Sequence, residues 1–208
     1  MTKKDQLQSE VLQKFSEIVG KSLHIDPLVV TPDSYLDELG AESLDLIEIS
    51  METEAQFDVW LPEKSILDTA AEVFGPGVLE KDGYLTEEGK RLMKCRMPDE
   101  DAAAFSGEVA VKDLRHYFQK VGTWTRMIES LLEHTPRVCA ACGGPLQSTL
   151  ALRMKCVNCA LEVSLRSGEE INREWVKEYH EKEYRSRAES PAAEMPAVES
   201  AAAQSAAQ

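Results

Sequence analysis

Basic residues are scarce in this 208-residue sequence, which has 23 lysines and arginines against 37 acidic residues and a formal net charge of -14. Phosphate backbones are bound through clusters of basic residues, so this balance disfavours a sequence-independent grip on DNA or RNA. Long apolar runs are also missing, and none reaches the length of a membrane span. The first residues, as far as Gln6, lack the apolar core of a secretory signal. We therefore expect a cytoplasmic protein that spans no membrane.

Cysteine is uncommon too, but four of the five cysteines form two Cys-x-x-Cys pairs: Cys139, Cys142, Cys156 and Cys159. Thirteen residues separate the pairs, which is the length of a hairpin. In a reducing compartment such spacing favours metal ligands over disulfides, and four thiolates suit a tetrahedral Zn²⁺ site. A redox dithiol would need only one pair, and a catalytic zinc would leave one ligand position open. The pattern therefore predicts a structural zinc site, the alternative being four unpaired buried thiols.

The segment around these cysteines, residues 135–168, resembles the zinc-ribbon family in general, a resemblance that names no function. Between Arg137 and Arg166 there are four basic residues and one acid. A zinc ion held by four thiolates adds two negative charges, which leaves a net charge of about +1. That is too little for a phosphate-binding footprint, so a docking or spacer role is expected for the ribbon.

Helical periodicity dominates the rest of the sequence up to residue 133. The apolar spacing predicts a first helix over residues 5–19, a long connection containing Pro27 and Pro32, and a second helix over residues 43–57. Ser43 would be the N-cap of that second helix, with Asp45 in its first turn. Further helices are expected over residues 65–74, 86–97, 109–119 and 124–132, with a break at Gly122.

The C-terminal part of the sequence carries little apolar surface. Residues 169–187 predict a charged helix with a thin apolar stripe of Ile171, Trp175 and Tyr179. Residues 188–208 consist mostly of Ala, Ser, Glu, Gln and Pro. Such a segment cannot offset its ordering entropy by burial, and we expect it to be disordered.

Acidic residues are concentrated between Thr31 and Pro62, where nine occur without any lysine or arginine: Asp33, Asp37, Glu38, Glu42, Asp45, Glu48, Glu52, Glu54 and Asp58. Like charges repel, so this pattern makes sense if a basic partner neutralises it. Within the second helix, Leu46, Ile49 and Phe57 suit a core, whereas Leu44, Ile47 and Met51 form a second stripe beside the acids. The second stripe predicts a docking surface for a basic-rimmed groove. The alternative is that this stripe is buried under residues 63–108.

The segment from Asp37 to Asp45 reads Asp-Glu-Leu-Gly-Ala-Glu-Ser-Leu-Asp. It resembles the acyl carrier protein signature, commonly Asp-x-Gly-x-Asp-Ser-Leu, and the helix before it and the acidic helix after it match that family in order and length. The resemblance covers residues 1–62 and returns near residues 109–120. It implies a protein that is not an enzyme, in which Ser43 carries a covalent 4′-phosphopantetheine arm that holds acyl groups as thioesters for fatty-acid, polyketide or related biosynthetic enzymes.

The resemblance also implies partners. A phosphopantetheinyl transferase would attach the arm, and acyl-loading and acyl-processing enzymes with basic surfaces would dock on the acidic helix. The docking residues would be Glu42, Leu44, Asp45, Ile47, Glu48, Met51 and Glu52.

The sequence departs from the family at two places. Glu42 stands where the family usually has aspartate, and residues 63–108 stand where the family has a short connection. The basic residues of that insertion could fold back onto the acidic helix and mask it: Lys64, Lys81, Lys90, Arg91, Lys94 and Arg96.

Other functions stay open at this point. Ser43 could be only an N-cap, and the chain could be an unmodified adaptor or regulator that acts through its ribbon, or a small metalloenzyme. A hydrolase nucleophile elbow is excluded, because Ala41 and Asp45 stand where that motif needs glycine. The four histidines, His116 among them, and Cys95 are expected to be structural or solvated.

Together these patterns predict a mainly α protein. An acyl-carrier-like helical domain would occupy residues 1–133, with an insertion at about 63–108, followed by a small β zinc ribbon over residues 135–168. The charged helix over residues 169–187 and the disordered tail over residues 188–208 would complete the chain.

Overall fold

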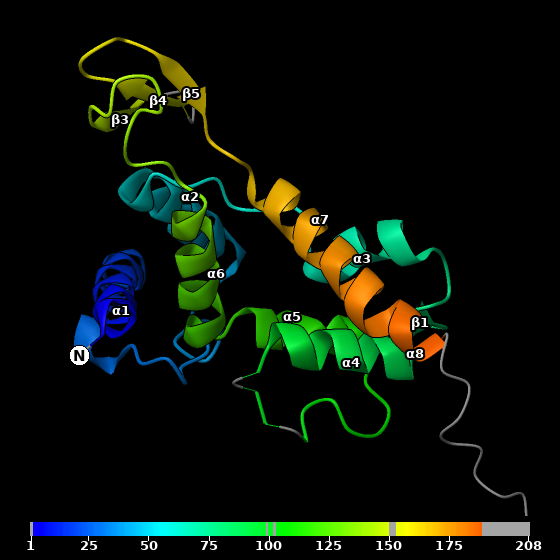
Figure 1. Ribbon diagram of the computed structural model, residues 1–208. Helices are drawn as coiled ribbons and strands as arrows, with labels where there is room; N and C mark the ends of the chain where they lie inside the picture. Colours follow the sequence, from blue (N-terminus) through cyan, green and yellow to red (C-terminus); the bar gives the residue numbers. More distant parts are fainter. Residues whose placement is uncertain (1, 99, 102, 150–152, 189–208) are drawn as a thin grey trace, which may run out of the picture.

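The computed structural model describes residues 2–98, 100–101, 103–149 and 153–188 (Figure 1). It is mainly helical with a small antiparallel sheet, as the sequence predicted. The predicted disorder of the tail falls almost entirely on residues outside this described part. None of the helices described is both long enough and apolar enough to cross a bilayer.

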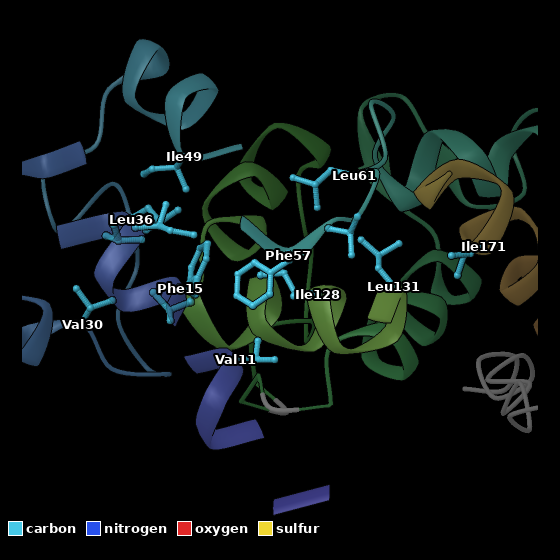
Figure 2. Packing of buried hydrophobic residues seen from close by; sticks show 14 residues of the cluster. Val11, Phe15, Val30, Leu36, Ile49, Phe57, Leu61, Ile128, Leu131 and Ile171 are labelled. Carbon is cyan, nitrogen blue, oxygen red and sulfur yellow. The ribbon is translucent and has the colours of Figure 1, made fainter. Parts of the chain in front are cut away.

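The first core lies between α1 (Lys3–Leu23), α2 (Ser43–Phe57) and α6 (Val121–Glu133), with the short η1 (Pro27–Val29) in the connection. Each helix contributes one apolar face, as amphipathic helices around a shared core do. Phe15 of α1 is fully buried and stacks on Trp124 of α6, with ring centroids 5.4 Å apart. Figure 2 shows Ile49 of α2 and Leu36 of the connection meeting Phe15 in this core. The buried side of α2 and the loop before it are thus packed against α1 and α6.

The insertion builds a second apolar core. Its elements are α3 (Ile66–Phe74), the hairpin of β1 (Glu80–Lys81) and β2 (Tyr84–Leu85), and α4 (Glu87–Arg96), followed by η2 (Val111–Asp113) and α5 (Leu114–Phe118). The hairpin lies between the two helices that the sequence predicts over residues 65–74 and 86–97. Asp82 and Gly83 both have positive φ, the signature of the two-residue turn that joins its strands.

The chain returns to this second core after the ribbon. α7 (Gly168–Tyr179) packs along α3, and the π-helix η3 (His180–Arg185) and α8 (Ser186–Ala188) continue from it (Figure 1). Val176 and Tyr179 are buried there together with Leu92 and Met93 of α4. The apolar face of the predicted charged helix is therefore broader than its three-residue stripe, because Val176 is part of it.

Gly122 does not break a helix, contrary to the sequence-based expectation. It lies in the first turn of α6, and its amide donates a hydrogen bond of 2.8 Å to the carbonyl of Pro32. A Cβ atom at this position would lie 3.0 Å from that carbonyl oxygen. Glycine is used here for the close approach of two backbones, and the helix begins one residue before it.

The ribbon is a separate three-stranded antiparallel sheet, in the order β3 (Leu146–Thr149), β4 (Arg153–Cys156) and β5 (Glu162–Ser164). It lies away from the helices at the top of Figure 1. Leu146 pairs with Cys156 in the register of β3 and β4, so the hairpin expected between the two cysteine pairs is present. Among the described residues of the ribbon, its own core consists of Cys139, Leu146, Met154, Cys156 and Leu165.

Candidate functional site

Ser43 is the first residue of α2, and not its N-cap as the sequence predicted. Glu42 is the N-cap, with extended backbone, and its amide donates a 2.7 Å hydrogen bond to the carboxylate of Asp45. Asp45, three residues further along the chain, thus caps the Glu42 amide, as in a capping box. The Ser43 side chain is exposed, and its hydroxyl is not needed to cap the helix.

The loop before α2 fixes where Ser43 points. Leu36 is completely buried, and its carbonyl accepts a 2.8 Å hydrogen bond from the amide of Ala41. Ile49, one turn and a half beyond Ser43, is also completely buried and anchors the other side of the helix. Because both flanks are held by the first core, the Ser43 hydroxyl stands on a rigid helix start at the surface.

Replacing Asp45 with alanine should destabilise the protein. The substitution leaves the Glu42 amide without its acceptor and removes a negative charge from the first turn of α2, a loss of about 1 kcal/mol. Urea unfolding, followed by circular dichroism, measures the change. Glu48→Gln is the matched control, since Glu48 is exposed on the same helix. Equal unfolding midpoints for the two variants would contradict the capping role of Asp45.

Basic side chains from a distant part of the sequence lie opposite Ser43. Arg115 of α5 donates from Nη2 to the Ser43 hydroxyl over 3.4 Å, and the two residues are 72 positions apart. Lys112 and His116 line the same open cleft of about 710 Å³. His116 also stacks on Tyr35 and lies 2.9 Å from the Asp37 carboxylate. The cleft can therefore place positive charge next to an anion attached at Ser43.

The outer face of α2, which we define as Leu44, Ile47, Glu48, Met51 and Glu52, is open to solvent. Leu44 is 79% exposed, Ile47 56% and Met51 66%, so the alternative in which the insertion buries this stripe is wrong. Glu48 is exposed, and Glu52 is half-buried. Of the other predicted docking residues, Glu42 is exposed and Asp45 is half-buried and engaged in capping.

The basic residues of the insertion do not mask this face. In the described part of the chain, Lys64 pairs with Glu72, Lys90 with Glu87 and Arg91 with Glu88, all within the insertion itself. Lys21 of α1 instead pairs with Glu52 at 3.0 Å, and its hydrogen bond lowers the pKa of that carboxylate. In the described part of the chain, Lys21 of α1 and Lys120, which pairs with Asp33, thus neutralise part of the acidic segment between residues 33 and 58.

The four paired cysteines come together at one end of the ribbon. Their sulfur atoms all lie within 4.8 Å of one another. Three of the separations are 3.6 Å for Cys139–Cys159, 3.4 Å for Cys142–Cys156 and 3.5 Å for Cys142–Cys159. Zn–S bonds of about 2.3 Å in a tetrahedron put sulfur atoms about 3.8 Å apart, so the cluster has the size that zinc requires.

The backbone around the cysteines supports thiolates. The amide of Cys159, together with that of Asn158, faces the Cys156 sulfur and lowers the pKa of that thiol to about 6. The Gly144 amide acts in the same direction on Cys142, but hydrogen bonds with the thiols of Cys156 and Cys159 outweigh it and raise the pKa of Cys142 to about 12. Gly143 follows the first pair with φ 69°, and Ala160 follows the second with φ 59°. Left-handed residues at these points turn the chain so that amides face the sulfur atoms.

The segment that contains Ser43 is similar in sequence to known proteins. The family model "Phosphopantetheine attachment site" matches residues 13–73. The "Acyl carrier protein" of Thermosynechococcus vestitus is 41% identical over 58 residues, which are 27% of this chain and 72% of that protein. The "Acyl carrier protein" of Rubrobacter xylanophilus gives the same identity and coverage. No solved structure matches the chain significantly.

Proposed function

The chain belongs to the acyl carrier protein family, and on that premise we propose that Ser43 carries a covalent 4′-phosphopantetheine arm and holds acyl intermediates on it as thioesters. The observation that carries the proposal is the exposed Ser43 hydroxyl at the start of α2, which the capping of that helix does not need. The protein would present its cargo to biosynthetic enzymes, those of fatty-acid or polyketide synthesis among them, and would catalyse no step itself.

The electrostatics at Ser43 favour a phosphodiester. A helix N-terminus presents backbone amides and a positive dipole end to an anion. Arg115 and Lys112 add two cationic side chains from the opposite wall of the cleft. Arginine suits this role because its planar guanidinium donates two parallel hydrogen bonds to a phosphate. The phosphate of the arm would thus be held on this chain even when no partner is bound.

Transfer of the arm from coenzyme A tests the proposal. The purified chain is incubated with a broad-specificity phosphopantetheinyl transferase and coenzyme A, and its intact mass is followed. We expect one phosphopantetheine group per chain. A chain that keeps its starting mass, while a known carrier in the same tube is modified, would contradict the proposal.

The outer face of α2 would be the surface on which the transferase and the acyl-processing enzymes dock. It combines exposed apolar side chains with acidic ones, and a basic partner surface is complementary to it. Exposed apolar residues beside a charged border are typical of a docking helix face. The charge of such a face governs mainly the rate of association.

Reversing the charge of Glu48 should slow docking. We expect Glu48→Lys to lower kcat/KM for arm transfer about tenfold at low ionic strength, with the difference shrinking as salt screens the charges. Glu10→Lys makes the same change of charge on an exposed position of α1 and is the control. Equal losses for both variants would show that net charge matters and the α2 face does not.

The ribbon would hold one structural Zn²⁺ through Cys139, Cys142, Cys156 and Cys159, and zinc bound there would supply folding energy to a very small core. Four sulfur ligands leave no open position for catalysis. Val138, Val157 and Leu161 are exposed large apolar residues on or beside the loops that bear the cysteines. We assign the ribbon a docking role on this basis, with the cytoplasm as the compartment that keeps its thiols reduced.

A further inference from the structure

An apolar cavity of about 490 Å³ lies between α2, α6 and the elements of the insertion. Met51 of α2, Trp124 and Met127 of α6, and Met97 beyond α4 contribute to its walls. Methionine side chains are flexible and adapt to apolar groups of different shape. The cavity therefore has the character of a site for an alkyl chain, and it exists in this form because the insertion closes one side of it.

One wall of this cavity carries Arg96, whose charge has no acidic partner in the described part of the chain. Its Nη2 donates to the neutral amide oxygen of Asn172 at 3.0 Å, and its guanidinium lies 5.4 Å from the ring centroid of Trp175. Burial lowers the pKa of this guanidinium, and so does the nearby Arg126. Arg96 is half-buried, and a charge partly withdrawn from water is costly unless it is paired, so the arrangement suits an anion that arrives with a ligand.

The acidic residues of the cavity do not supply that partner. Glu54 accepts a 2.9 Å hydrogen bond from the amide of Leu61, and Glu63 is exposed. Neither forms an ion pair with Arg96. Lys64 also lines the cavity and pairs outward with Glu72 at 2.7 Å. Three basic residues, Lys64, Arg96 and Arg126, thus line the cavity beside the two acidic ones.

The apolar cavity and the cleft of Ser43 are both adjacent to a further pocket. This third pocket has a volume of about 420 Å³. It shares Leu46, Lys112, Arg115 and Gln119 with the Ser43 cleft, and Ser65, Phe118 and Trp124 with the apolar cavity. The three pockets are therefore neighbours along α5, and a flexible arm attached at Ser43 would run along this side of the molecule to approach the wall that carries Arg96.

We propose that the apolar cavity takes the distal part of an acyl chain that ends in a carboxylate, and that Arg96 binds this carboxylate. The inference rests on the proposed function, because the chain reaches the cavity on the phosphopantetheine arm. The methylene groups would replace water against Met51, Met97 and Trp124. The terminal carboxylate would give the Arg96 guanidinium a charge-assisted hydrogen-bonding partner, which a methyl end cannot. The preferred cargo class is therefore a dicarboxylic acyl thioester.

Matched cargoes test the proposal on the full-length protein. The chain is loaded by the transferase from octanoyl-coenzyme A or from suberoyl-coenzyme A, which have equal length and differ in the terminal carboxylate. Cleavage of each thioester by hydroxylamine is then followed by intact mass. We expect the suberoyl thioester to be cleaved about tenfold more slowly than the octanoyl one, because the charge-assisted hydrogen bond holds it in the cavity.

Two variants assign the effect to Arg96. Arg96→Gln should bring the two cleavage rates together, and Lys94→Gln, on the exposed side of the same helix, should leave their ratio unchanged. Equal rates for both cargoes on the unaltered chain would overturn the inference alone, and this comparison does not depend on the folding of any variant. A chain that accepts neither cargo overturns the proposed function and the inference with it.

Discussion

Ser43→Ala is expected to abolish attachment of the phosphopantetheine arm completely. The hydroxyl is the atom that would form the phosphodiester, and no neighbouring side chain can replace it at the start of α2. The measurement is the intact mass after incubation with coenzyme A and a phosphopantetheinyl transferase. Ser9→Ala, at an exposed position of α1, is the matched control and should be modified as fully as the unaltered chain.

The stability of the same variant separates the carrier from the simpler interpretation of Ser43 as a helix cap. Loss of an N-cap serine costs about 1 kcal/mol of unfolding free energy. Ser43 lies inside the helix and Asp45 caps the Glu42 amide, so Ser43→Ala should change the unfolding free energy by less than about 0.5 kcal/mol. A stable variant that still accepts one arm would contradict the assignment of Ser43.

Removing one sulfur ligand should unfold the ribbon. We expect Cys156→Ser to lose the zinc ion and the dispersed NMR signals of β3, β4 and β5, since structural zinc supplies about 10–16 kcal/mol of apparent binding energy in comparable peptides. The described ribbon residues contribute five buried side chains to a core, which is too few to replace that energy. The helices should keep their structure, because neither helical core contains a residue of the ribbon sheet.

Cys95→Ser provides the control for this experiment. Cys95 is an exposed free cysteine on α4, outside the cluster. Metal analysis of the Cys95→Ser protein should give one zinc per chain, and cobalt substitution should give the spectrum of four sulfur ligands. A Cys156→Ser protein with full zinc content and an unchanged ribbon spectrum would contradict the zinc site.

Local patterns in the sequence were sufficient to predict part of the site. The two cysteine pairs predicted a cluster because each pair and the hairpin between them lie within 21 consecutive positions, Cys139 to Cys159. The extent of α2 was predicted correctly, since the apolar period and the following residues up to Pro62 define it. The prediction that Ser43 is its N-cap was wrong. Ser43 and Glu42 compete for that position, and only the backbone conformation decides between them.

Long-range packing accounts for what the sequence could not predict. Arg115 meets Ser43 only because α5 is held between the two cores, and no spacing rule connects positions 72 residues apart. Arg96 meets Asn172 across 76 positions for the same reason. The second core joins the insertion to α7, and its existence explains why forty-odd extra residues fold instead of forming a loop.

The most direct test of the account is the mass of the peptide that contains Ser43, taken from the protein purified from its native cell. We expect that peptide to carry one phosphopantetheine group, with or without an acyl group on its thiol. A Ser43 peptide that is recovered entirely without a prosthetic group, from cells in which other carriers are modified, would contradict the account.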